Sequence, residues 1–158
     1  MRRAHTALKA GAWPVAERAC TVTLSYLERH RRRIRLVSDQ GEPLLLDLAK
    51  AVLLNDGDGL ALDEGGYVEV KAANEALLEI RAGTAGLPRL AYHLGNRHLS
   101  LQLLPDALLI RDDHVIADMV RVLGGEVRAV SRPFTPEAGA YAGGHSHSHG
   151  FEDDDEQG

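Results

Sequence analysis

The spacing of apolar residues changes near residue 73, and this change constrains the fold more than any other feature. Before it, short segments of alternating apolar and polar residues are separated by Gly- and Asp-rich clusters at 55–59 and 63–66. Such a pattern is typical of short strands joined by turns. It predicts strands at 21–27, 34–37, 43–47 and 67–70. We therefore expect a small β-rich N-terminal domain over residues 1–73.

Two helices are expected in the second half of the chain. The first begins near Pro88, whose missing N–H is harmless in a first helical turn, and we expect Gly95 to end it. The second begins after Asp113, a residue type that caps helix N-termini, and ends at Gly124. Each segment places apolar residues on one helical face, so each helix should pack against a sheet.

Strands are predicted around these helices at 75–81, 99–103, 107–110 and 126–131. The resulting β-α-β-β-α-β order is the ferredoxin-like arrangement, in which we expect an antiparallel sheet with both helices on one face. We assign residues 74–136 to this second domain. Residues 137–158, rich in Gly, Ala, Pro, His and acidic residues, are assigned to a flexible tail. The predicted fold class is therefore α+β.

Composition limits the core and the cellular setting. Aromatic residues are 4% of the chain and hydrophobic residues 44%, so the core must be built from Leu, Val, Ile and Ala. Cys20 is the single cysteine, which excludes an intrachain disulfide and a Cys-based zinc site, and we expect a reduced, structural thiol. No apolar run approaches the roughly 18 residues that span a bilayer. We expect a soluble cytoplasmic protein with no membrane partner.

Charge argues against one broad class of partner. The net charge of −5 disfavours a general nucleic-acid binder. The basic run Arg29–Arg35 alternates around Ile34, which favours the polar face of a strand and its turn. An RNA or DNA contact is conceivable for this run, but an acidic partner protein is the better functional alternative.

The tail carries the most direct chemical signal. His145, His147 and His149 alternate with serines, and alternate side chains of an extended chain project to one side. Three imidazoles could thus converge on one ion, or two chains could share it. Imidazole suits Ni²⁺, Zn²⁺ and Cu²⁺, so the pattern predicts a metal without selecting one. The alternatives are a solvated polar tail or a purification tag. The acidic run 152–156 is either a source of oxygen ligands or a solubilising end.

Two further clusters contain histidines. His93 and His98 would lie about 140° apart in one continuous helix, so they would not chelate one ion together. His114 opens the second helix behind Asp112 and Asp113, where helix capping accounts for the acidic residues. Judged by the residues alone, these are surface histidines. No His-Glu-x-x-His string or Ser-His-Asp arrangement supports a metal-dependent hydrolase.

Several strings together resemble the UreE family of urease accessory proteins, which are nickel metallochaperones. The resemblance rests on Leu46-Asp-Leu48, Leu54-Asn-Asp-Gly-Asp58, Tyr92-His-Leu-Gly-Asn-Arg-His98, Asp113-His-Val115 with Asp118-Met119, and Gly139-Ala-Tyr141. The Tyr-His-Leu-Gly-Asn-Arg-His string is specific, whereas the His-rich tail by itself is not.

The resemblance implies a β-rich N-terminal domain thought to bind peptide, a ferredoxin-like metal-binding domain, and a homodimer formed through the second domain. His98 would then bind nickel at the dimer interface, one residue from each subunit, which solves the problem of a lone ligand. His93 matches the family string as well. Where some members carry a His-x-His pair, this chain departs from the pattern with Asp112 and His114, which leaves a mixed carboxylate–imidazole site or no peripheral site as the alternatives.

The function that the resemblance implies is that of a chaperone, not an enzyme. The tail would collect Ni²⁺, the paired His98 residues would hold one ion, and the ion would pass to the urease apoprotein and its accessory complex, including the maturation GTPase. Zn²⁺ and Cu²⁺ are further candidate ions. The alternatives are a general Zn/Cu/Ni-binding buffer and a protein-binding module without a role in urease assembly.

Overall fold

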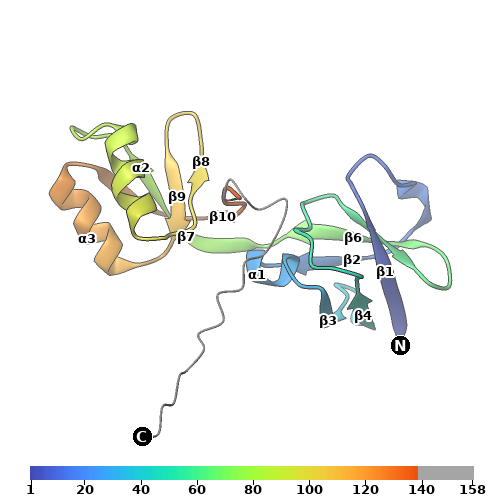
Figure 1. Ribbon diagram of the computed structural model, residues 1–158. Coiled ribbons are helices and arrows are strands. Elements are labelled where there is room, and N and C mark those ends of the chain that lie inside the picture. The colour runs from blue at the N-terminus through green and yellow to red at the C-terminus, as the bar shows by residue number, and fades with distance from the viewer. Residues whose placement is uncertain (139–158) are drawn as a thin grey trace, which may run out of the picture.

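The computed structural model describes residues 1–138, and its two sheets form two lobes joined by a continuous ribbon (Figure 1). Strands β6 (Tyr67–Ala72) and β7 (Asn74–Arg81) follow each other and pass from one lobe to the other. The predicted change of architecture near residue 73 therefore coincides with the change of sheet. The domain limits 1–73, 74–136 and 137–158 stay predictions.

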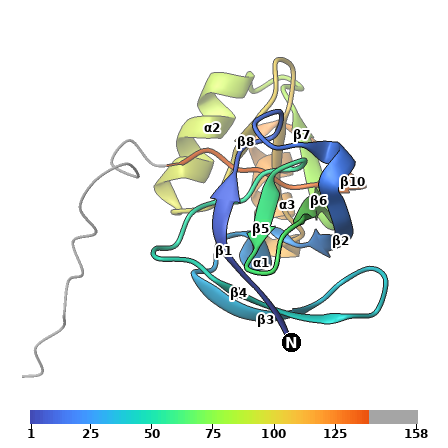
Figure 2. The ribbon, with the colours of Figure 1, turned by 90° about the vertical axis from the view of Figure 1, so that its right-hand side faces the viewer.

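The other strands of the N-terminal lobe are β1 (Arg2–Leu8), β2 (Arg18–Leu24), β3 (Arg33–Val37), β4 (Pro43–Asp47) and β5 (Gly59–Leu62). With β6 they form a six-stranded sheet in the order β2-β6-β5-β1-β4-β3. The pairs β1–β4 and β2–β6 are parallel, and the other neighbours are antiparallel. Figure 2 shows that this sheet curls around its own interior.

Aliphatic side chains fill the inside of the curled sheet. The buried cluster consists of Ala4, Cys20, Val22, Leu24, Leu36, Leu44, Leu46, Leu48, Leu54, Leu60, Leu62, Val68 and Val70. It contains no aromatic residue, as the low aromatic content predicts. Burial raises the pKa of the Cys20 thiol, which keeps it protonated and agrees with a structural role.

The N-terminal lobe differs from its prediction in three places. Strands β1 and β5 were not predicted. β1 is rich in polar residues and pairs with β4 and β5, which are distant in sequence, whereas β5 is a four-residue strand between the two turn clusters at 55–59 and 63–66. The strand predicted at 21–27 is wrong beyond Leu24. Ser25 instead caps helix α1 (Tyr26–Arg29), accepting a hydrogen bond from the Glu28 N–H while the Glu28 carboxylate accepts one from the Ser25 N–H. A 3-10 helix at Val15–Glu17 was also missed.

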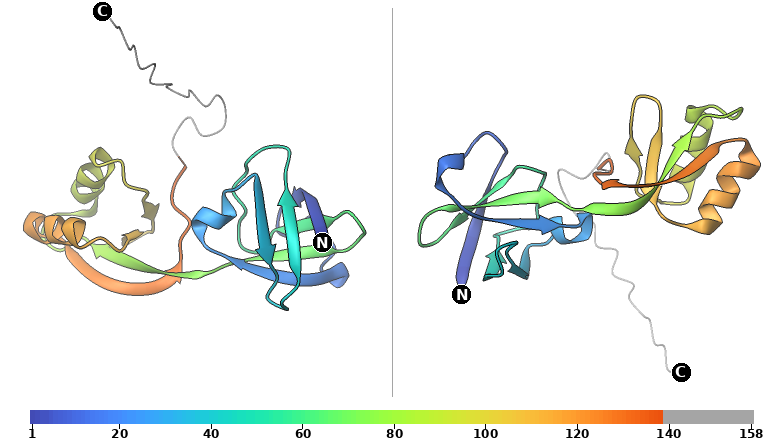
Figure 3. Two further views of the ribbon diagram at one scale, coloured as in Figure 1. Left: turned by 90° about the horizontal axis from the view of Figure 1, so that it is seen from below. Right: turned by 180° about the vertical axis from the view of Figure 1, so that it is seen from behind.

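The C-terminal lobe adds α2 (Leu87–Asn96), β8 (Gln102–Leu103), β9 (Leu108–Arg111), α3 (His114–Leu123) and β10 (Glu126–Pro133) to β7. The sheet is antiparallel with the order β10-β7-β9-β8. The predicted β-α-β-β-α-β order is therefore confirmed (Figure 3).

Both helices pack on the same face of this sheet. Their shared core consists of Leu78, Ile80, Leu90, Leu94, Leu108, Ile110, Ile116, Ala117 and Val120. These strand residues alternate along β7 and β9, so they all project from one side of the sheet. Glu79 projects from the opposite side of the sheet and is 5% exposed. Its carboxylate accepts hydrogen bonds from Arg81 at 2.9 Å and from Arg128 at 3.0 Å. The Arg81 bond is the main cause that lowers the pKa of Glu79.

Helix α2 does not end where the sequence predicts. Gly95 lies inside the helix, which continues to Asn96. The helix ends through a turn in which the His98 N–H donates to the Gly95 carbonyl at 3.0 Å. The predicted strand 99–103 is then reduced to β8, and Leu99 and Leu101 pack against the helix-side core.

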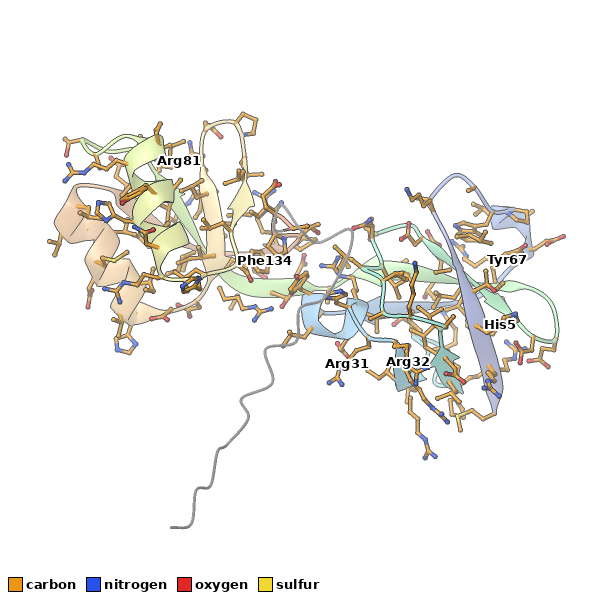
Figure 4. The ribbon with its side chains drawn as sticks, viewed as in Figure 1. His5, Arg31, Arg32, Tyr67, Arg81 and Phe134 are labelled. Carbon is orange, nitrogen blue, oxygen red and sulfur yellow. The ribbon has the colours of Figure 1, made fainter. Side chains whose placement is uncertain are left out.

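A buried arginine connects the two lobes. Arg29, at the end of α1, is fully buried and donates to the Leu54 carbonyl at 3.2 Å and to the Phe134 carbonyl that follows β10. Figure 4 shows Phe134 at the junction between the lobes. The Tyr26 N–H also donates to the Glu75 carboxylate of β7, at 3.0 Å. Burial lowers the pKa of the Arg29 guanidinium, an effect that the nearby Glu75 opposes.

Candidate metal centre

His98 stands in a special backbone conformation. Its φ is +56°, and it is the single non-glycine residue among residues 1–138 with a positive φ. Histidine is one of the residue types that adopt this left-handed conformation more readily than most. The turn ends α2 in the way that glycine usually ends a helix. As a result, the His98 side chain is exposed just beyond the helix end.

A hollow of about 310 Å³ brings His98 close to an acidic segment. Its lining consists of His98, Leu99, Ser100, Ile110, Arg111, Asp112 and Asp113. The segment that follows α2 supplies the first three residues, and the end of β9 with the two residues before α3 supplies the others. The fold therefore joins two of the predicted metal ligands, His98 and Asp112, although they are distant in sequence.

The two aspartates of this hollow have different tasks. The Asp113 carboxylate accepts hydrogen bonds from the N–H groups of Val115 at 3.0 Å and Ile116 at 3.2 Å, so it caps α3 as predicted. Asp112 is exposed, and its side chain forms no hydrogen bond or salt bridge within residues 1–138. Asp112 is therefore the carboxylate of the hollow that is available to an ion.

The other histidines of the domain lie outside the hollow. His93 is half-buried in the last turn of α2, with its ring 5.4 Å from the ring of Tyr92. His114 is the first residue of α3 and is exposed. Neither lines the hollow that contains His98. His145, His147 and His149 lie outside the described residues.

Within the described residues, the ligand set is incomplete. No group of three or more His, Cys, Asp or Glu side chains in residues 1–138 is arranged to hold a metal ion. Protein sites for nickel, zinc or copper ordinarily use at least three such donors. One imidazole and one carboxylate at the hollow would therefore need ligands from residues 139–158, from a second copy of the chain, or from water.

Arg111 is a residue of the hollow that sequence reasoning did not single out. Its guanidinium lies 5.4 Å from the centre of the Tyr26 ring and 5.7 Å from that of Phe134. These cation–π contacts hold Arg111 against the junction between the lobes. The hollow is therefore in contact with the N-terminal lobe through one side chain, a link between α1 and β9 that only the tertiary structure could reveal.

The chain thus belongs to the class of two-lobed α+β proteins in which a β-rich sheet precedes a β-α-β-β-α-β unit, and here a histidine and two aspartates line one hollow of that unit. Within this class it belongs to the UreE family of urease accessory proteins. The family model for the UreE N-terminal domain matches residues 2–73, and the model for the UreE C-terminal domain matches residues 75–158. Together the two models cover nearly the whole chain.

Individual relatives agree with this assignment. A urease accessory protein UreE of Rhodopseudomonas palustris strain HaA2 is 54% identical over 128 residues, which are 80% of this chain and 60% of the relative. UreE of Chelativorans sp. strain BNC1 is 48% identical, covering 85% of this chain and 88% of the relative. UreE of Rhodobacter capsulatus is 44% identical, covering 95% and 94%. The chain thus spans less than two thirds of the first relative.

One structural finding bears on the cellular setting. Among residues 1–138, no helix combines the length and the apolar character that are needed to cross a membrane.

Proposed function

We propose that the protein is a nickel metallochaperone that delivers Ni²⁺ for assembly of the urease active site. Two observations support this proposal. The chain belongs to a family whose members are named urease accessory proteins. The hollow at the end of α2 combines the imidazole of His98 with the carboxylate of Asp112. Imidazole and carboxylate are ligands that can bind Ni²⁺, and they can also bind Zn²⁺ and Cu²⁺.

A homodimer would complete the site. In a symmetric dimer, a residue near the two-fold axis meets its own copy, so two His98 imidazoles and two Asp112 carboxylates can share one ion. Exposed apolar side chains on the helices next to the hollow support an interface there: Tyr92 is 65% exposed on α2 and Val115 is 55% exposed on α3. Such side chains lose unfavourable contact with water when a second copy covers them.

The His-rich segment has the role of a collector in this proposal. His145, His147 and His149 offer imidazoles on small, polar spacers, which suits capture of an ion and its transfer to the paired His98 residues. His93 and His114 are additional donors for ions in transit. Stepwise exchange of imidazole ligands keeps the barrier to transfer low. A protonated imidazole cannot bind a metal, so nickel binding weakens as pH falls through the histidine pKa range.

The partners follow from the same proposal. The ion passes to the urease apoprotein and its accessory complex, including the maturation GTPase, in the cytoplasm. The protein breaks no substrate bond and therefore acts as a carrier and not as an enzyme.

Calorimetric titration with Ni²⁺ tests the assignment of the ligands. We compare the intact chain, a chain ending at Gly143, His98→Ala, and His114→Ala as a matched control, since His114 is an exposed imidazole outside the hollow. Truncation is expected to lower the number of ions bound per dimer and to leave one tight site. His98→Ala should abolish that tight site, whereas His114→Ala should retain it. Equal tight binding by His98→Ala and the intact chain would contradict the interface assignment.

A general Zn/Cu/Ni buffer is the rival function, because imidazole donors do not select among these ions. Urease activity at limiting nickel separates the two. A strain without this protein should lose urease activity under limiting nickel and regain it with added nickel. Full activity in the deletion strain would favour the buffer, or a protein-binding module, over the chaperone.

A further inference from the structure

The edge strand β3 of the N-terminal lobe and the two residues before it carry a dense positive charge. Arg31, Arg32, Arg33 and Arg35, which we call the basic edge, are all exposed. Figure 4 shows Arg31 and Arg32 pointing away from the lobe, between the end of α1 and the start of β3. The inward residues of the same strand, Ile34 and Leu36, pack against the core.

Little of this charge is neutralised within residues 1–138. Arg32 lies 3.8 Å from the carboxylate of Asp47 on the neighbouring strand. Asp47 is already bound by Arg3, whose hydrogen bond is the main cause that lowers the pKa of Asp47. Arg31, Arg33 and Arg35 form no salt bridge in the described part of the chain. The guanidinium groups of the basic edge are therefore available to bind anionic groups.

The backbone of β3 is also open to a partner. β3 is the last strand in the sheet order. The Leu48 N–H donates to the Arg32 carbonyl and the Ser38 N–H donates to the Glu42 carbonyl, both at 2.8 Å. In an antiparallel pair, residues alternate between bonding the neighbour strand and facing away from it. The N–H and C=O groups of Arg33, Arg35 and Val37 therefore point away from β4. The next N–H on that side, that of Asp39, donates to the Thr21 carbonyl of β2 at 2.8 Å, so the edge that is open within residues 1–138 is limited to Arg33–Val37.

We propose that the acidic run Glu152–Glu156 of the same chain docks along the basic edge. If this run is extended beside β3, Glu152, Asp154 and Glu156 project to one side with the two-residue spacing that Arg33 and Arg35 have on the strand. Carboxylates and guanidinium groups form strong, charge-assisted hydrogen bonds. The free backbone groups of β3 add strand-type hydrogen bonds. Charged side chains on an edge strand also discourage aggregation, and both roles are compatible.

The path of the chain favours this occupant over a separate acidic protein. The Phe134 carbonyl accepts a hydrogen bond from Arg29, and three residues later the Glu137 N–H donates to the Leu101 carbonyl of the C-terminal lobe at 2.7 Å. The acidic run is therefore tethered to the C-terminal lobe a few residues beyond the junction between the lobes. An extended chain covers at most about 3.3–3.6 Å per residue, so residues 139–151 can span roughly 40 Å. A tethered segment meets its site at an effective concentration of about millimolar, which an untethered partner must exceed. Docking would hold the His145–His149 segment near the N-terminal lobe.

Amide NMR spectra of the metal-free chain test the proposal at low ionic strength. The intact chain is compared with a chain ending at Gly150, which retains every histidine. Removal of residues 151–158 should shift the amide signals of Arg33, Arg35 and Val37 and leave those of α2 and α3 unchanged. An added peptide with the sequence of residues 151–158 should restore the original signals, and about 0.3 M salt should abolish its effect, because salt screens exposed charges. A peptide with Gln and Asn in place of Glu and Asp should have no effect.

A matched pair of variants separates docking from diffuse attraction. Arg33→Glu/Arg35→Glu should make the intact and truncated spectra coincide at β3, whereas Arg89→Glu/Arg121→Glu, with the same charge change on exposed helix residues, should retain the difference. Loss of the difference in both variants would overturn the proposal. So would unchanged β3 signals after truncation. If β3 responds only to other acidic peptides, the surface belongs to a partner and the proposal is also wrong. Metal is absent throughout, so these outcomes are independent of nickel binding.

Discussion

At the scale of single residues, His98 combines backbone strain with chemical availability. A non-glycine residue at positive φ is less stable than glycine in the same place, and such residues gather at functional sites. The left-handed turn ends α2, and the chain continues to Leu99 and Leu101, which pack against the helix-side core. The side chain itself packs against little, so nothing in the fold of residues 1–138 requires an imidazole there.

Replacement of His98 by glycine tests this separation of fold and function. We expect His98→Gly to raise the free energy of unfolding by up to about 1 kcal/mol, because glycine adopts a positive φ without steric cost. The same variant should lose the tight nickel site. Urea denaturation and nickel titration measure the two effects, with Gly86→Ala as the opposite control, since Gly86 also has a positive φ and would gain a side chain. Marked destabilisation by His98→Gly would show that the imidazole has a structural role.

At the scale of elements, two neighbouring carboxylates at the start of α3 have different roles. One stabilises the helix, and the other is available to bind an ion. Asp113 satisfies two N–H groups that no helical carbonyl can reach. Asp112 precedes it by one residue and faces the hollow with His98. The helix cap thereby fixes the position of the residue that is available to an ion.

These two roles predict opposite mutant phenotypes. Asp113→Ala should lower the free energy of unfolding by about 1 kcal/mol through loss of the cap. Asp112→Ala should change it by less than about 0.5 kcal/mol, as expected of an exposed side chain without partners. Nickel affinity should fall for Asp112→Ala and be nearly unchanged for Asp113→Ala. Urea denaturation and calorimetry on the same samples make the comparison, and an unchanged nickel affinity in Asp112→Ala would remove that residue from the ligand set.

At the scale of the whole molecule, a compact cluster couples the lobes. Arg29 and Tyr26 of α1 contact Phe134 after β10, and Arg111 stacks on both aromatic rings while it also lines the hollow. The last described segment continues from Phe134 to the C-terminal lobe, where the Glu137 N–H donates to the Leu101 carbonyl at 2.7 Å. A change in the N-terminal lobe can thus reach the candidate metal centre through these contacts.

Removal of the Arg29 charge should weaken this coupling. Arg29→Met leaves the buried carbonyls of Leu54 and Phe134 without their donor, so we expect a loss of roughly 3 kcal/mol in the free energy of unfolding. Amide hydrogen exchange at Thr135 and Glu137 should also become faster. Arg31→Met, two residues away and exposed, is the control and should change stability by less than about 0.5 kcal/mol. Equal stability of the two variants would contradict a structural role for Arg29.

Local patterns were sufficient to predict the C-terminal unit. Helical spacing of apolar residues, the Asp113 cap and the glycines after α3 are short-range signals, so the order of strands and helices was predicted correctly. The predictions failed where distant partners decide the structure. β1 is central in its sheet although its sequence is highly charged, because it pairs with β4 and β5. Gly95 is helical although glycine usually ends helices, and the left-handed turn falls at His98 instead.

The sequence by itself determined the family, the α+β class and the residue types that can bind a metal, since these depend on composition, spacing and specific strings. Only the tertiary structure decided which of those residues meet. His98 and Asp112 share a hollow because β7 and β9 pair and both helices cover the same face, whereas His93 and His114 lie outside it. Side-chain proximity across a fold depends on strand pairing and helix packing, and neither is encoded in the spacing of neighbouring residues.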